Sequence, residues 1–298
     1  MEDKKQLLII DANSVIHRAY HALPPLTSKS GEMVNAVYGF LLVFLKVIKE
    51  FKPAFVAACF DVKGPTFRHK KFEDYKAKRP KAPEELYSQI PIVKEILRAF
   101  NVPIFEKNGF EADDIIGTIA FLSPVKTIIL SGDADALQLV NSKTKVFALR
   151  KGVKDTVLYD EQLTKEKFKG LVPSQVSDFK GLRGDPSDNI PGVKGIGEKT
   201  ATELLLNFGD LEKIYQEIEK IKPKTKELLL EHKELAFLSR DLAKIEKSVP
   251  IEFNLKKCRW GEYHKENPKK LLENLGFDSL IKRLPENQPS LGGNLRLW

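Results

Sequence analysis

The chain has 298 residues, of which 42% are hydrophobic, and its 49 lysines and arginines against 41 aspartates and glutamates give a formal net charge of +8. This composition supports a sizeable core and excludes a largely disordered protein, while the basic excess favours a polyanionic partner. Two cysteines are too few for a disulfide framework, and the longest apolar stretch, residues 40–48, is too short to cross a bilayer, so we expect a cytoplasmic protein without membrane contacts.

Three short apolar runs predict buried strands. They are residues 6–11 (QLLIID), 55–61 (FVAACFD) and 127–133 (TIILSGD). Nearly continuous apolar runs of this kind are typical of strands covered on both faces. Between them, apolar residues at helical spacing predict helices over 36–50, 84–100 and 112–122. The alternation of strand and helix predicts an α/β fold with a mostly parallel central sheet flanked by helices.

Each predicted strand ends in an aspartate, namely Asp11, Asp61 and Asp133. Because open parallel sheets bind ligands beyond the carboxyl ends of their strands, we expect these acids at one edge. Later loops and helix starts can bring six more acids there: Glu111, Asp113, Asp114, Asp135, Asp185 and Asp188. One acid at a helix start is ordinary, since it stabilises the helix dipole by about 0.3–1 kcal/mol. Nine acids directed to one edge call for another explanation.

Carboxylates this close together need protons or cations. Two like charges about 4 Å apart repel by about 4 kcal/mol at an effective dielectric constant of 20. Oxygen ligands without histidine or cysteine select Mg²⁺ or Mn²⁺ rather than Zn²⁺. Paired divalent ions are the usual apparatus for hydrolysing phosphodiester bonds, so the acids predict a metal-dependent reaction of this class.

Two further segments favour nucleic acid. Residues 63–81 hold eight lysines and arginines, two acids and three interleaved aromatic residues, and they begin beside Asp61. Residues 191–200 (PGVKGIGEKT) predict a tight glycine turn between helices near 173–182 and 198–207. Its exposed amides can bind a phosphate or a monovalent cation. A solvated lysine-rich loop and a plain tight turn remain the alternatives.

Five segments resemble signature motifs of the bacterial and phage 5′-nuclease family, which includes flap endonucleases and the N-terminal domain of DNA polymerase I. They are DANSVIHRAYHA, CFDVKGPTFRHKKFEDYKAKR, GFEADDIIGTIA, SGDADALQLV and GDPSDNIPGVKGIGEKTATELL. The resemblance runs from about residue 6 to 284. It implies a PIN-like nuclease core over 1–170 with a helical arch near 66–90, and a helical subdomain over 171–284 that contains a helix-three-turn-helix. Residues 285–298 form a tail without a counterpart.

The resemblance also implies roles for individual residues. One metal site would use Asp11, Asp61, Glu111, Asp113 and Asp114, and a second would use Asp133, Asp135, Asp185 and Asp188. At least two Mg²⁺ ions are expected, with Mn²⁺ able to replace them, and a K⁺ ion at the glycine turn. Among the acids, Asp61 and Asp133 are assigned to catalysis.

The expected DNA contacts divide between the basic segment and the glycine turn. By the resemblance, Tyr75 stacks near the scissile nucleotide, and Lys76 and Arg79 approach the scissile phosphate as catalytic residues. Arg68 would contact another phosphate. Duplex backbone would be held by Gly192, Lys194, Gly195, Gly197 and Lys199.

The implied activity is that of a structure-specific 5′ nuclease, both 5′-3′ exonuclease and flap endonuclease, in DNA replication and repair. Its substrate would be a 5′ end or flap beside duplex DNA, including RNA primers on DNA. We expect a monomer with a DNA polymerase as partner, either on a separate chain or on the same one. The alternatives are a non-catalytic binder of DNA junctions and an RNase with the same acidic core.

Overall fold

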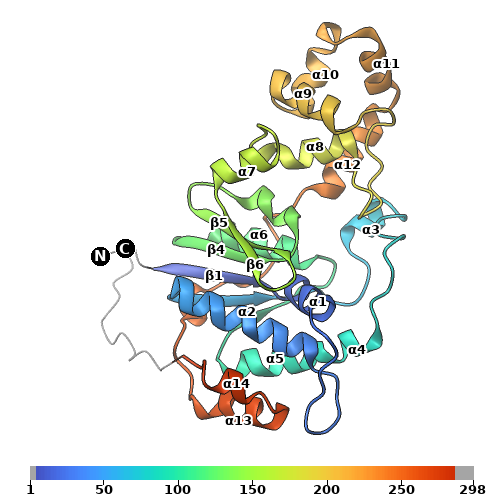
Figure 1. Ribbon diagram of the computed structural model, residues 1–298. Coiled ribbons are helices and arrows are strands. Elements are labelled where there is room, and N and C mark those ends of the chain that lie inside the picture. The colour runs from blue at the N-terminus through green and yellow to red at the C-terminus, as the bar shows by residue number, and fades with distance from the viewer. Residues whose placement is uncertain (1–4, 286–298) are drawn as a thin grey trace.

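A six-stranded sheet forms the centre of the computed structural model, which describes residues 5–285 (Figure 1). The strands are β1 (Gln6–Asp11), β2 (Phe55–Cys59), β3 (Ile104–Phe105), β4 (Lys126–Ser131), β5 (Thr144–Lys151) and β6 (Asp155–Tyr159). Their order is β3-β2-β1-β4-β5-β6, and every neighbouring pair is parallel except β5 and β6. The predicted mostly parallel sheet with flanking helices is therefore confirmed.

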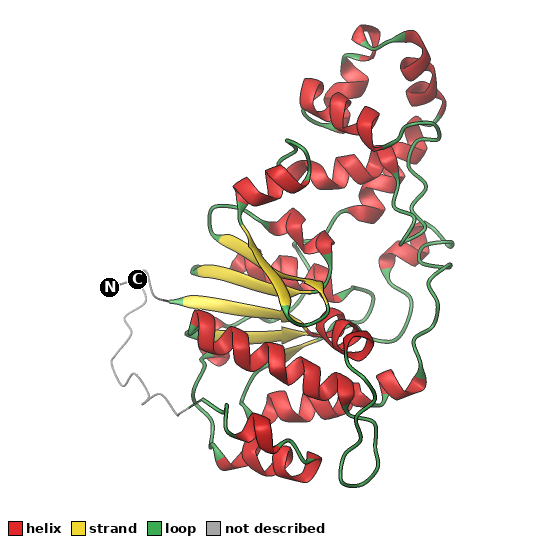
Figure 2. Ribbon diagram, viewed as in Figure 1, coloured by secondary structure: helices red, strands yellow, loops and turns green. Residues whose placement is uncertain are grey.

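Both faces of the sheet are covered, which explains the continuous apolar runs (Figure 2). On one face, Leu8 and Ile10 join a core with α1 (Ala12–Ala22), α2 (Asn35–Phe51) and α5 (Gln89–Ala99). On the other face, Leu7 and Ile9 pack with α6 (Ala112–Leu122) and the 3-10 helix η2 (Ala134–Leu139). The helices α13 (Glu266–Leu275) and α14 (Asp278–Ile281) add Leu272 and Leu280 to the first core. Among the described helices, none has both the length and the hydrophobicity to cross a membrane.

The basic segment contains less helix than expected. It consists of α3 (Phe67–Lys71), a series of turns over 73–79 and α4 (Glu84–Tyr87). The helix predicted over 84–100 is divided at Ser88 into α4 and α5. Pro91 accounts for the division, since it has no N–H to offer the carbonyl of Tyr87 four residues earlier.

A second group of helices has its own core, at the upper end of the molecule in Figure 1. It contains α7 (Glu161–Lys167), α8 (Val176–Arg183), α9 (Glu198–Phe208), α10 (Leu211–Gln216), α11 (Pro223–Glu231) and α12 (Lys233–Ala243), with the 3-10 helices η3 (Pro173–Gln175) and η4 (Ile218–Lys220). The glycine turn lies between α8 and α9, as predicted. After α12 the chain returns to the sheet, where η5 (Leu255–Cys258) precedes α13.

Candidate active site

A cavity of about 390 Å³ lies at the edge where the parallel strands end. Seven of the nine predicted acids line it: Asp11, Asp61, Glu111, Asp113, Asp133, Asp135 and Asp188. Basic side chains line it as well, from the segment over 63–81 and from α1. Asp114 and Asp185 are not among the lining residues. The topology thus brings together most of the acids that the strand-end rule selected.

The strand ends are tied to one another by hydrogen bonds. Asp11, the last residue of β1, accepts one from the backbone N–H of Ser14 at 3.2 Å and one from the hydroxyl of Ser131 at 2.6 Å. The hydroxyl of Ser14 in turn accepts the N–H of Gly132 at 2.9 Å. These bonds join the start of α1 to the end of β4, so the carboxylate of Asp11 has a defined direction.

Asp61 and Asp133 lie two residues beyond their strands, because β2 ends at Cys59 and β4 at Ser131. The carboxylate of Asp61 accepts the N–H of Ala112 at 2.8 Å, which places it at the start of α6. Asp133 caps η2 by accepting the N–H of Asp135 at 2.9 Å. Both acids therefore come from short loops that are held by helix starts.

Four acids in the cavity, Asp11, Asp61, Asp113 and Asp133, form no ion pair with any residue between 5 and 285. Burial raises the pKa of Asp11 to about 6, and repulsion from Asp61 and Asp133 adds to the effect. Burial raises the pKa of Asp113 well above its ordinary value, and Asp11 and Asp133 raise it further. These four acids, called the uncompensated acids below, thus have no cation in contact, and at Asp11 and Asp113 the confined space disfavours the ionised form unless a cation binds.

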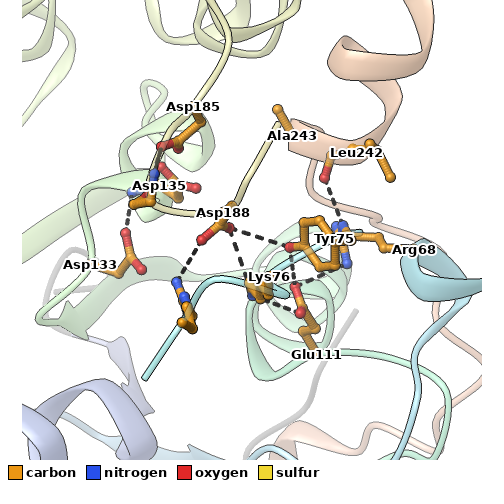
Figure 3. Close-up of polar contacts among 12 residues, drawn as sticks. Arg68, Tyr75, Lys76, Glu111, Asp133, Asp135, Asp185, Asp188, Leu242 and Ala243 are labelled. Carbon is orange, nitrogen blue, oxygen red and sulfur yellow. Dashed lines mark hydrogen bonds and ion pairs between the residues drawn. The ribbon is translucent and has the colours of Figure 1, made fainter. Parts of the chain in front are cut away.

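The other acids are paired with cations (Figure 3). Glu111 contacts the ammonium of Lys76 at 2.7 Å, and Asp188 contacts the guanidinium of Arg79 at 2.7 Å. The hydroxyl of Tyr75 lies 3.1 Å from a carboxylate oxygen of Glu111 and 3.3 Å from one of Asp188, so its single proton is shared between these two acceptors. Burial alone raises the pKa of Glu111, but Lys76 and Arg68 outweigh it and hold that pKa below its usual value. The basic segment therefore lies directly against the acids.

Lys76 has a constrained backbone in this arrangement. Its φ of +57° lies in the left-handed region, which is uncommon for a residue with a side chain. Its N–H donates to the carbonyl of Asp188 at 2.9 Å, and the side-chain amide of Asn189 donates to the carbonyl of Asp74 at 2.7 Å. The loop 185–190 thus holds the basic segment in place beside the cavity.

Several residues of the site have no clear signal in the sequence. The ammonium of Lys180 in α8 donates hydrogen bonds to the carboxylate of Asp135 and, at 2.6 Å, to that of Asp185. These contacts join the helical part to the sheet. The only sequence feature that could have indicated this role is the position of Lys180 about one helical turn before the acidic loop 185–190. His17, Arg18 and His21 of α1 also line the cavity. Their spacing after Asp11 is helical, which could have indicated that they lie on the face of α1 that is directed toward Asp11.

Three predicted site residues are engaged by other parts of the protein, although Arg68 and Tyr75 still reach the wall of the cavity. Arg68 and Asp114 form an ion pair with guanidinium–carboxylate distances of 2.7 Å, and their exposed fractions are 2% and 0%. Tyr75 is also buried, at 3% exposed, in a small apolar cluster with Ile190 and Leu242. In this conformation none of the three presents a free surface to DNA.

The glycine turn presents its polar groups outward. Val193 and Ile196 are buried in the helical core, while Lys194, Gly195, Gly197 and Lys199 are exposed. Gly192 differs from them, because it is buried and its N–H donates to the hydroxyl of Ser239 at 3.0 Å. The structure therefore leaves four of the five predicted turn residues accessible to a ligand.

Most donors at the sheet edge are carboxylate oxygens, which suit hard divalent cations, but the imidazoles of His17 and His21 line the cavity as well, which was not predicted from the sequence. Between residues 5 and 285, however, no three acid, histidine or cysteine side chains converge as a ready-made site for one ion. The uncompensated acids are chemically matched to hard divalent cations.

The sequence matches known families over most of its length. Residues 6–169 match the family described as 5′-3′ exonuclease, N-terminal resolvase-like domain, and residues 171–266 match the 5′-3′ exonuclease, C-terminal SAM fold. DNA polymerase I of Bacillus subtilis (strain 168) is 41% identical over 291 residues, and that of Caldicellulosiruptor bescii is 44% identical over 284 residues. These alignments cover 96% and 94% of this chain but 33% of each relative, so the chain spans about a third of their length.

Solved structures show the same fold. T5 5′-exonuclease, with zinc ions bound, has a TM-score of 0.66 at 20% identity, and the match covers 94% of this chain and 97% of that one. Flap endonuclease-1 from Methanococcus jannaschii has a TM-score of 0.61 at 20% identity, covering 95% and 91%. The family matches include the sheet, its acidic edge and the helical part. The chain therefore belongs to the 5′-3′ exonuclease family, whose members are nucleases.

Proposed function

We propose that this chain is a metal-dependent, structure-specific 5′ nuclease that hydrolyses phosphodiester bonds at 5′ ends and flaps of DNA. The observation that carries the proposal is one cavity in which uncompensated carboxylates lie beside Lys76 and Arg79. Carboxylates hold divalent ions, and the two cations can hold a phosphate. Solved relatives that are described as a 5′-exonuclease with zinc and as the catalytic core of Rad2 with DNA support a divalent ion and a DNA substrate.

Mg²⁺ is the proposed ion, with Mn²⁺ able to replace it. The uncompensated acids Asp11, Asp61 and Asp113 would contribute to one site with Glu111. Asp133 would contribute to a second, together with three paired acids, Asp135, Asp185 and Asp188. When bound, the ions supply an activated water and positive charge that stabilises the phosphate and the leaving 3′ oxygen. The products would carry a 5′-phosphate and a 3′-hydroxyl.

The basic segment would hold the substrate phosphate. Lys76 and Arg79 contact acids that are themselves candidate metal ligands, so divalent ions would release both cations toward a phosphate. For Tyr75 to stack on a base, residues 72–79 would have to leave the position described here, since the ring is buried. We therefore propose that DNA binding repositions this part of the chain.

The helical part would hold duplex DNA. The exposed residues of the glycine turn and the start of α9 can contact backbone phosphates and a K⁺ ion. We assign residues 1–170 to the nuclease core and 171–243 to this DNA-binding subdomain. Residues 245–284, which the resemblance places in the same subdomain, pack instead against the two cores of the sheet. The tail beyond Pro285 lies outside the described residues. With the same assignment we propose RNA–DNA hybrids as further substrates and a DNA polymerase as a partner.

Removal of divalent ions should abolish cleavage. A 5′-labelled flap on a nicked duplex is incubated with Mg²⁺, with EDTA, and with EDTA followed by excess Mg²⁺. We expect cutting at or within about one nucleotide of the junction, complete loss with EDTA and recovery afterwards. Tight flap binding without cutting in Mg²⁺ or Mn²⁺ would favour a non-catalytic junction binder. An RNA flap then tests primer removal.

Lys76→Ala should slow the chemical step more than it weakens binding. A cation that stabilises charge on the reacting phosphate is worth about 10²–10³-fold in rate. The measurement is the single-turnover rate at saturating enzyme, with flap affinity measured in Ca²⁺. Lys78→Ala is the matched control, because Lys78 lies at an exposed position in the same segment and forms no ion pair with residues 5–285. An equal loss in rate and affinity would make Lys76 a binding residue only.

A further inference from the structure

Arg68 is a buried cation whose donors are fully engaged. Its two terminal nitrogens donate to the two carboxylate oxygens of Asp114, each at 2.7 Å. Its Nε donates to the carbonyl of Leu242 at 2.8 Å, and Nη2 also donates to the carbonyl of Lys244 at 2.7 Å. Figure 3 shows the guanidinium behind Tyr75, with the bond to Leu242 marked. No donor remains directed toward solvent.

Asp114 is equally enclosed. Besides Arg68, its carboxylate accepts the N–H of Glu111 at 3.1 Å and the N–H of Glu246 at 2.9 Å. Four hydrogen bonds use the acceptor capacity of a carboxylate. Its sequence neighbour Asp113 lines the cavity and Asp114 does not, as expected for adjacent residues on a helix, which point in different directions.

The pair lies directly behind Glu111. Nη1 of Arg68 is 3.3 Å from Oε2 of Glu111, and the hydroxyl of Tyr75 reaches the same oxygen. The pair therefore connects three segments: α3 of the basic segment, the start of α6, and residues 242–246 that follow α12. A shift in any of these segments would change the contacts of the Glu111 carboxylate.

We propose that Arg68 and Asp114 form one positioning unit that orients Glu111, and that neither residue contacts DNA or a metal ion. The inference rests on the proposed nuclease activity and reassigns two residues that the family resemblance places in contact with ligands. To bind a metal ion, Asp114 would have to abandon buried hydrogen bonds and leave Arg68 unpaired. Breaking one side of a buried ion pair is strongly unfavourable, whereas removing both sides is often tolerated.

A double-mutant cycle tests the unit. The variants are Arg68→Gln, Asp114→Asn and the double variant, and Asp113→Asn is the matched control on the cavity side. We measure the melting temperature, the single-turnover rate on the flap, flap affinity in Ca²⁺, and the number of bound Mn²⁺ ions by calorimetry. Arg68→Lys keeps the charge without the two-pronged geometry, and it serves if a neutral single variant fails to fold.

A positioning unit predicts a specific pattern. Each single variant lowers the melting temperature and reduces the rate by about 100-fold, as a displaced catalytic group does. The double variant melts no lower than the singles and is about as slow as the slower single, because either single substitution already removes the orientation of Glu111 that both residues maintain. It binds as many Mn²⁺ ions as the unmodified chain and binds the flap within about threefold of it, since neither residue touches either ligand; Asp113→Asn loses Mn²⁺.

Other results would overturn the inference. Rate losses that multiply in the double variant would indicate separate roles, and loss of a bound Mn²⁺ ion in Asp114→Asn would make that residue a ligand. A more than tenfold loss of flap affinity in Arg68→Gln would make it a DNA contact. Full activity in the double variant would reduce the pair to a structural contact. If the unmodified chain cuts no DNA, the proposed function fails, while the Mn²⁺ count and melting temperatures still test the pairing.

Discussion

Asp133→Ala should reduce flap cleavage by at least about a thousandfold, because each carboxylate that holds a divalent ion supports several kcal/mol of transition-state stabilisation. Asp133 lines the cavity and has no ion pair among the described residues, so its charge is available to a metal ion. Its removal eliminates a ligand without leaving a cation unpaired. The fold should persist, since its cap on η2 is a local contact that costs about 1 kcal/mol when lost.

Rate and binding have to be measured together for this variant. Single-turnover cleavage is followed over a series of Mg²⁺ concentrations, and flap affinity is measured in Ca²⁺. We expect affinity to stay within a few-fold of the unmodified chain. Glu252→Ala, at an exposed acid outside the cavity, is the control and should cleave normally. Normal turnover of Asp133→Ala at saturating Mg²⁺ would remove this residue from the metal site.

Gly192→Ala should destabilise the helical part by about 3 kcal/mol, through overpacking together with the left-handed backbone. The φ of Gly192 is +67°, and an added Cβ would lie 2.2 Å from the backbone nitrogen of Gly184 and 2.6 Å from the carbonyl carbon of Arg183. Backbone atoms cannot move aside as a flexible side chain can. The strain falls where α8 ends and the acidic loop 185–190 begins, so flap binding and cleavage should both decline.

Gly197→Ala is the matched control in the same turn. Gly197 has a φ of −93°, and an added Cβ would meet no atom within 4 Å. As the N-cap of α9 it should lose no more than about 1 kcal/mol. Urea denaturation separates the two variants. Equal stabilities would show that the backbone around Gly184 relaxes, and the close approach would then have no energetic consequence.

The sequence alone determined the main architecture of this protein. Runs such as 6–11 could be assigned to strands because both faces of a parallel sheet are buried, and apolar periodicity located α2 and α6. The acids after these strands could be placed at one edge because parallel strands end together. Chemistry then followed from residue type, since oxygen ligands favour divalent ions and the basic segment favours phosphate.

Only the tertiary structure decided the direction of each side chain. Asp113 and Asp114 are adjacent acids, yet one lines the cavity and the other forms a buried pair with Arg68. The contact of Lys180 with Asp135 joins residues 45 positions apart, and the approach of Gly192 to Gly184 depends on how a loop closes on a helix end. Local periodicity cannot predict such contacts, because they depend on which face of each helix is packed and against what.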